Sequence, residues 1–222
     1  MKKKRNSIFT IVTAITALAL GVFAVGASPV SAADWGIDGA HSSVSFSVSH
    51  MVISETTGKF TDFAGSASFD TTDMSGASAE LTIQVASLTT ENTKRDDHLR
   101  SGDFFDVEKF PTITFVTTKI TLADDGALSV VGDMTMKGVT NSVTFTGKLR
   151  GIINDPWGNT RAGLTLSATI DRTDFDVNWS KPLDGGGLLV GHDVDMTLEF
   201  ELVQTQPEEE ADADAEDATD SD

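Results

Sequence analysis

Apolar and polar residues alternate with a period of two in eight separate segments between residues 33 and 205. In one of them, Val44, Phe46 and Val48 alternate with serines. Successive side chains of a β-strand point to opposite faces, so each segment predicts a strand with one apolar and one polar face. The eight segments are residues 43–49, 63–69, 79–85, 112–115, 128–136, 143–149, 164–170 and 190–202.

One stretch, residues 89–106, breaks this alternation. Its charged centre, residues 91–100, predicts a short helix that ends at Gly102. Turn signals separate several strands, as at Asp124-Asp125-Gly126 and in the loop 154–159. The chain is therefore expected to be all-β, with a single short helix.

Strands with one apolar face must close or stack to bury it, and closure also removes exposed sheet edges. We therefore predict an eight-stranded antiparallel barrel with the helix capping one end. Two interpretations of its interior remain open, a cavity or a solid core with glycines at bulges and kinks. Small residues share the inward parity of the strands, namely Gly65, Ala67, Ala77, Ala79, Gly147 and Ala168.

The two ends of the chain differ from this pattern. Residues 1–32 have a basic start, an uncharged and mostly apolar run from Ile8 to Val25, and small residues before Ala33, which is typical of a secretory signal peptide. We expect cleavage after Ala32, with a periplasmic or secreted product that keeps no membrane anchor; an uncleaved anchor helix is the alternative. Residues 206–222 predict a disordered acidic tail, because they contain no large apolar residue to bury. The barrel then occupies residues 33–205.

Charge and cysteine content narrow the function classes. The formal net charge is -18, which disfavours nucleic acids and anionic membrane surfaces as partners. The chain has no cysteine, so neither a disulfide framework nor a lipoprotein anchor is available.

The segment RDDHLRSGDFFD at 95–106 is the most specific motif in the chain, and the opening segment 35–51 is another. Further motifs lie at 58–65, 111–115, 132–140 and 172–179. In residue type and spacing these segments resemble the YceI-like family of lipid- or polyisoprenoid-binding, lipocalin-like barrels. The resemblance implies an elongated eight-stranded barrel that holds an isoprenoid-like chain, and it allows a homodimer. Asp176 stands where the family pattern has glycine. Asp adopts the left-handed backbone conformation more readily than most other non-glycine residues, so the substitution is tolerable there.

Candidate ligand-binding residues are those on the apolar parities and around the helix. We expect them to line the lumen, and we expect His192, which shares the parity of Val190 and Val194, to point inward as well. The full set is Phe46, Val48, Phe63, Ile83, His98, Leu99, Phe104, Phe105, Phe115, Met134, Met136, Phe145, Leu166, Trp179 and His192.

Polar groups at the helix are the candidates for holding a ligand headgroup, namely Arg95, Asp97 and His98. A catalytic role for His98 with a carboxylate is the weaker interpretation, because the chain has no cysteine and no Gly-x-Ser-x-Gly elbow. We expect no metal site and no cofactor, since no histidine pair has ligand spacing and His41 and His50 are expected on opposite strand faces.

Together with this resemblance, which implies a polyisoprenoid as the ligand, the sequence predicts an exported carrier that binds a long-chain amphiphilic lipid in a barrel and does no chemistry on it. Two alternatives remain: a structural or stress-response barrel without a ligand, and an enzyme acting on a lipid or quinone through His98 and a carboxylate.

Overall fold

The computed structural model describes residues 32–70 and 74–205. The predicted tail and nearly all of the predicted signal peptide lie outside these residues. Within the described ranges, no helix has the length and apolarity needed to cross a bilayer.

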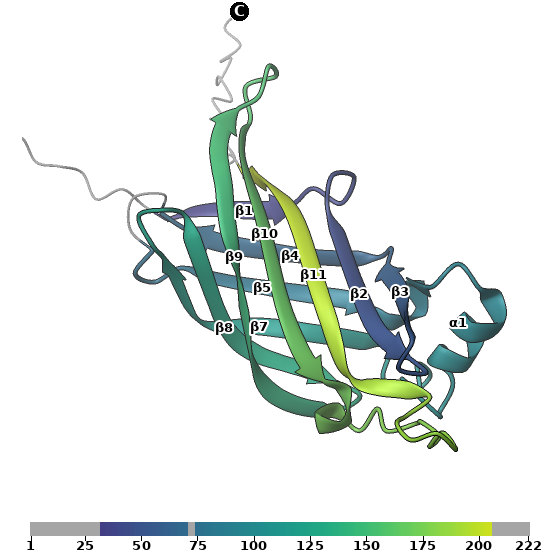
Figure 1. Ribbon diagram of the computed structural model, residues 1–222. Helices are drawn as coiled ribbons and strands as arrows, with labels where there is room; N and C mark the ends of the chain where they lie inside the picture. Colours follow the sequence, from purple (N-terminus) through teal and green to yellow (C-terminus); the bar gives the residue numbers. More distant parts are fainter. Residues whose placement is uncertain (1–31, 71–73, 206–222) are drawn as a thin grey trace, which may run out of the picture. The chain divides into compact units, whose positions relative to one another are not determined.

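Eight antiparallel strands form a closed ring, as predicted (Figure 1). The ring closes because β1 pairs with β4 on one side and with β11 on the other. In ring order the strands are β1 (Ala33–Ile37), β4 (Phe63–Phe69), β5 (Ser78–Gln84), β7 (Thr112–Leu122), β8 (Ala127–Met136), β9 (Val139–Asn154), β10 (Thr160–Asp171) and β11 (Val190–Gln204).

Three further strands extend the sheet from β11 toward one end of the barrel. They are β2 (Ser43–His50), β3 (Ser54–Phe60) and β6 (Leu88–Thr89), joined in that order. Helix α1 (Thr93–Arg100) follows β6 and lies at this end, which we call the near end (Figure 1). The far end carries the β9–β10 hairpin and the β1–β2 loop. Two 3-10 helices complete the described elements, η1 (Val85–Ser87) and η2 (Arg172–Phe175).

The predicted strands and the helix are confirmed, but β1, β3 and β6 were not predicted. β1 has five residues and β6 has two, too few to display a period. β3, with the sequence SETTGKF, is mostly polar and has one buried side chain, Phe60, at its end. It therefore shows no alternation of apolar and polar residues. Asp176 has φ of 59°, so it does adopt the left-handed conformation that its glycine-like position requires.

The small inward residues serve two different purposes. Ala67, Ala77 and Ala79 line an internal cavity, as the first interpretation of the interior expects. Gly65 and Gly147 instead allow neighbouring strands to approach, because a Cβ on either would collide with a backbone carbonyl oxygen, of Glu80 and Thr165 respectively. For these two glycines the interpretation as empty space is wrong.

An ion-pair network connects three elements at the far end. The Arg161 guanidinium on β10 donates from Nε to Asp155 (2.7 Å) and from Nη1 to Asp38 (2.8 Å) and Glu201. Asp155 also accepts from the backbone N–H groups of Trp157 and Asn159, both at 2.9 Å, and so shapes the β9–β10 loop. Arg161 thereby fastens that loop and the β1–β2 loop to β11.

Candidate functional site: the barrel lumen

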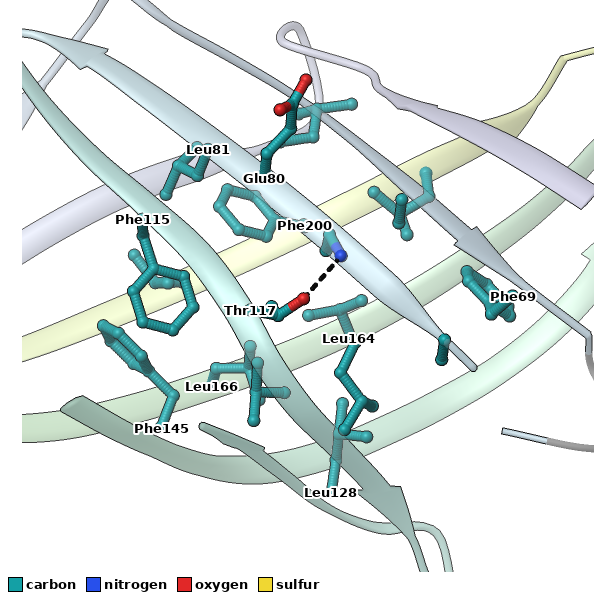
Figure 2. A pocket seen from close by; sticks show the side chains of 18 of the residues that line it. Phe69, Glu80, Leu81, Phe115, Thr117, Leu128, Phe145, Leu164, Leu166 and Phe200 are labelled. Atoms are coloured by element: carbon teal, nitrogen blue, oxygen red, sulfur yellow. Dashed lines mark hydrogen bonds between the residues drawn. The ribbon is translucent and has the colours of Figure 1, made fainter. Parts of the chain in front are cut away.

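An apolar cavity of about 100 Å³, which we call the far cavity, lies in the part of the lumen toward the far end. Aromatic and aliphatic side chains from all eight ring strands surround it, among them the predicted ligand residues Phe115, Phe145 and Leu166 (Figure 2). The Thr117 hydroxyl also lines it and already accepts from the Ala79 N–H at 2.8 Å. Such a surface suits hydrocarbon, because a polar group placed there would lose its hydrogen bonds to water.

A second apolar cavity of about 80 Å³, the near cavity, lies toward α1. It adjoins an outer cavity of about 200 Å³, the mouth, and the two share Phe46, Val48, Leu99, Phe104 and Val190. Among the predicted ligand residues, the near cavity also includes Phe105 and Met136, and the mouth includes His98 and Trp179.

Buried side chains separate the far cavity from the near cavity. Val44, Ile83 and Met134 are at most 2 % exposed and line neither one. The strand register places them at the boundary: Met134 is opposite Phe115 of the far cavity, and Ile83 is opposite Ile113 of the near cavity. We call these three residues the waist. Two predicted ligand residues, Ile83 and Met134, therefore lie between the cavities.

Phe63 also lies in neither of these cavities. It is half-buried, and its ring centroid is 6.1 Å from that of Phe200, which does line the far cavity. In this structure Phe63 supports the lumen wall from β4.

Helix α1 is held over the near end by charged side chains that bind the backbone of β6 and η1. The Asp96 carboxylate, which is buried, accepts from the Thr90 N–H at 2.8 Å and from the hydroxyls of Thr90 and Thr89. Burial alone would raise the pKa of Asp96, but these hydrogen bonds outweigh it and lower the pKa. Arg100 donates to the carbonyls of Ala86 (3.0 Å) and Leu88.

Two of the three headgroup candidates face the mouth. The Arg95 guanidinium uses Nε and Nη2 on Thr90, at 2.7 and 2.9 Å, and its Nη1 has no hydrogen-bond partner among the described residues. His98 lies edge-on to Trp179, with ring centroids 4.8 Å apart, and its Nε2 is 2.8 Å from Asp103 Oδ2. The mouth thus offers an unused guanidinium N–H beside an oriented imidazole.

The third headgroup candidate, Asp97, does not face the mouth, so this prediction is wrong. The Asp97 side chain is 69 % exposed, lines none of the three cavities and pairs with Arg100 at 3.4 Å. The reason is helical geometry, because residues 95, 98 and 99 share one face of α1 whereas residue 97 points away from it.

The prediction that His192 points inward is also wrong. Its side chain is 50 % exposed and lies 4.0 Å from Asp171. The β2–β11 register shifts between Val190 and Val194. Because of this irregularity, the His192 side chain does not point to the same face as those of Val190 and Val194.

Arg172 is a lumen residue that was not among the candidates, although it lies in a family motif. It is 5 % exposed and lines the near cavity, where burial lowers the pKa of its guanidinium. Its N–H groups donate to the carbonyls of Gly191 (2.7 Å), Val190 (3.2 Å) and Val177. Arg172 therefore connects the loop after η2 to the start of β11 beside the mouth.

A group of potential metal ligands lies outside the lumen. Ligand atoms of Asp38, His41 and Glu201 lie within 4.8 Å of one another. Arg161 donates to both carboxylates and so supplies the positive charge that a cation would bring. We interpret this group as part of the far-end network.

Comparisons with known proteins agree with this geometry. Residues 35–202 match the profile of the YceI-like domain. A UPF0312 protein of Staphylococcus aureus strain MSSA476 is 38 % identical over 168 residues, which cover 74 % of this chain and 95 % of that protein. The crystal structure of Burkholderia cenocepacia BcnA has a TM-score of 0.66 at 26 % identity, covering 74 % of this chain and 98 % of that one. A structure described as a polyisoprenoid binding domain from Saccharophagus degradans shares the fold, with a TM-score of 0.57 at 13 % identity over 77 % of this chain and 98 % of that chain.

Proposed function

Because the chain belongs to the YceI-like family, we propose that it is an exported binding protein that holds a long-chain amphiphilic lipid, a polyisoprenoid, in its barrel. The observation that carries this proposal is the polarity of the lumen. Two hydrocarbon-lined cavities follow one another along the barrel, and Arg95 and His98 face the mouth beside the nearer one.

Burial of the apolar chain would supply the binding free energy. Each methylene transferred from water contributes about 0.8 kcal/mol, so twenty buried carbons contribute about 16 kcal/mol. Micromolar affinity needs about 8 kcal/mol, which leaves room for much of the entropy lost on association. A branched, unsaturated chain fits such a lumen through its shape and needs few polar contacts.

The polarity of the lumen also sets the orientation of the ligand. A headgroup in the far cavity would be buried among hydrocarbon side chains without hydrogen bonds, which is unfavourable. At the mouth, Arg95 Nη1 can donate to it and the imidazole of His98 lies on the same helix face. We therefore place the headgroup at the mouth and the chain end toward the far cavity.

A chain that reaches both cavities must pass the waist. An apolar cavity of about 150 Å³ accommodates a molecule the size of benzene, so each cavity alone suits only a short segment of chain. Met134 has an unbranched, flexible side chain that can change rotamer. Displacement of this side chain is the step that joins the two cavities for a longer ligand.

Two observations support the ligand class and the absence of chemistry. The Saccharophagus degradans domain with the same fold is described as polyisoprenoid-binding. His98 with Asp103 resembles an oriented base, but its ring lies edge-on between Phe104 and Trp179 at the mouth, where a headgroup would pack. We therefore expect the bound lipid to be recovered chemically unchanged.

Lipid extraction and mass spectrometry of protein purified under native conditions test this function. The expected result is a co-purified isoprenoid chain that Ala79→Met reduces about tenfold, because the new side chain fills the far cavity. Ser78→Met is the matched control, since the neighbouring side chain is exposed and should leave the lipid content unchanged. Wild-type protein without bound lipid would favour the structural alternative.

Export is tested separately from binding. We expect the exported protein to begin at Ala33, which N-terminal sequencing can determine. An intact Met1 in the cell envelope would favour the anchor-helix alternative. The homodimer remains a prediction that sedimentation of the purified protein can test.

A further inference from the structure

The turn between β2 and β3 has an unusual combination of backbone conformation and sequence. Met51 and Val52 have φ of 56° and 65°, and the Ile53 N–H donates to the His50 carbonyl at 3.3 Å. Two consecutive residues with positive φ form the tight hairpin turn that favours Asn-Gly. A β-branched residue such as Val52 is strongly disfavoured there, so the turn keeps apolar side chains at a conformational cost.

Packing within the protein offsets little of this cost. We call residues 51–53 the tip; the exposed fractions are 39 % for Met51, 67 % for Val52 and 83 % for Ile53. The Val52 side chain contacts Gly187, where a Cβ would lie 2.7 Å from Val52 Cγ2. Most of the tip therefore faces solvent, and a partner outside the barrel would explain why apolar residues occupy it.

The tip lies at the rim of the mouth. Ser49 and His50, directly before it, line the mouth, and so does Leu189. The Met51 N–H donates to the Leu189 carbonyl at 2.9 Å, so the tip is joined to the loop that precedes β11. A surface that received the tip would therefore also meet the opening of the ligand cavity.

The rim residues suit the interface of a bilayer with neutral headgroups. Trp179 lies at the mouth, and Lys181 Nζ is 5.9 Å from the centroid of its ring, a pair of amphipathic side chains of the kind that gathers at the headgroup level. Lys181 is offset by Asp184 in the same exposed loop. With a net charge of -18 for the whole chain, attraction to an anionic surface is not expected, and apolar insertion is the remaining driving force.

We propose that the tip inserts into the surface of a zwitterionic lipid bilayer and holds the mouth against it, so that the ligand passes between membrane and barrel without crossing water. This inference rests on the proposed function for the identity of the cargo. Docking itself needs no ligand, so the two can fail independently.

Flotation of ligand-free protein with phosphatidylcholine vesicles tests the docking. In the variant Met51→Asn/Val52→Gly the turn has its favoured sequence, so the melting temperature should equal or exceed that of the wild type. Its vesicle-bound fraction should nevertheless fall about tenfold, because the inserting side chains are gone. Ile53→Thr leaves both positive-φ residues unchanged and should also lower the vesicle-bound fraction.

The control removes exposed apolar side chains from the opposite end. Ile153 is 65 % and Trp157 is 81 % exposed, both near the β9–β10 turn. Ile153→Ser/Trp157→Ser should bind vesicles like the wild type. The proposal is overturned if wild type does not float with the vesicles, if the tip variants still do, or if the control variant loses binding equally.

Two further measurements test whether a second copy of the chain binds the tip and whether docking speeds ligand transfer. The first is the oligomeric state. If the wild type is dimeric, the tip variants are monomeric and the wild type floats no better than they do, the tip binds a second copy of the chain and the proposal is overturned. Vesicles carrying a polyprenol should load wild type about tenfold faster than the tip variant, with equal final occupancy. Vesicle binding without any polyprenol uptake would leave docking in place and contradict the proposed function.

Discussion

The two ends of the barrel are held together in different ways. At the far end, Arg161 pairs with three carboxylates from separate segments, and Trp35 stacks on Phe69 with ring centroids 4.8 Å apart. At the near end, Arg172 and Arg100 bind backbone carbonyls, and a strained turn presents apolar side chains to solvent.

This difference indicates a division of labour. Ion pairs among partly buried groups depend on several segments keeping their positions, which makes the far end suited to maintaining barrel closure. At the near end, Asp96 and Arg100 of α1 bind only the one short segment 86–90, so movement of α1 need not displace several segments of the barrel. The near end is therefore the end at which we expect a ligand to enter.

The largest expected effect follows from removing the far-end guanidinium. Arg161→Met removes the ion pair of Asp155, whose side chain is 4 % exposed, and leaves Asp38 and Glu201 without this positive charge, so it should lower the unfolding free energy strongly. Urea denaturation measures it. Arg150→Met, at an exposed position on β9, removes the same charge and should cost less than about 0.5 kcal/mol. Equal losses in both variants would show that the far-end ion-pair network does not stabilise the barrel.

A smaller effect is expected at the waist, between the two ends. Met134 is 1 % exposed, so Met134→Ala should destabilise the ligand-free protein by about 3 kcal/mol through the space it opens. The same space joins the far and near cavities, so an added polyprenol should restore more stability to this variant than to wild type. Thermal melts with and without polyprenol measure both quantities. Equal restoration would mean that the ligand does not pass the waist.

The sequence was sufficient to predict the barrel because its signal is repeated. The eight alternating segments all form strands, and the charged break at 91–100 contains the helix Thr93–Arg100. The ring nevertheless contains the unpredicted β1 in place of the predicted segment 43–49, which forms β2 beside it. Strands such as β1 escaped prediction because five residues carry no measurable period, although β1 closes the ring with β11. Closure depends on pairing partners far apart in the chain, which a local pattern does not contain.

The candidate site was predicted less completely, for reasons that particular residues show. Parity placed Phe46 and Phe115 at the cavities correctly, but it failed for His192 because a shift in register changes which face a side chain reaches. The subdivision of the lumen by Val44, Ile83 and Met134 depends on three-dimensional packing. Arg172 was overlooked because a charged residue is rarely expected inside an apolar barrel.

A third prediction compares matched substitutions at the two cavities. Phe46 is half-buried between the near cavity and the mouth, so Phe46→Trp can extend into free space and should change ligand-free stability by less than about 1 kcal/mol. The added ring would occupy ligand volume and lower affinity about tenfold.

The same substitution at the far cavity should destabilise the ligand-free protein more strongly. Phe115 is 6 % exposed, and its ring packs edge-on to Phe145 with centroids 5.2 Å apart. Phe115→Trp should therefore cost about 1–3 kcal/mol through overpacking. Melts of delipidated protein, with bound lipid quantified in parallel, measure both variants. Strong destabilisation by Phe46→Trp would show that the near end is as solidly packed as the far end.

The smallest expected effect is a pH dependence confined to the far end, where Asp38 and His41 are 3.0 Å apart. Hydrogen bonds from Arg161 and His41 lower the pKa of Asp38 from 3.8 to about 2, and the Asp38 carboxylate raises the pKa of His41 above 6.5. The contribution of Asp38 to stability is thus complete above pH 3.8 and is lost as pH falls toward 2, whereas that of His41 is complete below pH 6.5 and is lost as pH rises through its raised pKa. Both are present together between these limits.

His41→Gln tests this window. The His41 side chain is 62 % exposed, so solvent and salt screen the pair and the difference in melting temperature from wild type should be small. We expect that difference to be largest near pH 5, to decline by pH 8.5 as the imidazole loses its proton, and to shrink in high salt at pH 5. The glutamine can still donate a hydrogen bond to Asp38, so what it removes is the positive charge. A difference that is the same at pH 5 and pH 8.5 would show that the contact stabilises the β1–β2 loop through its shape, and that Arg161 alone supplies the charge at the far end.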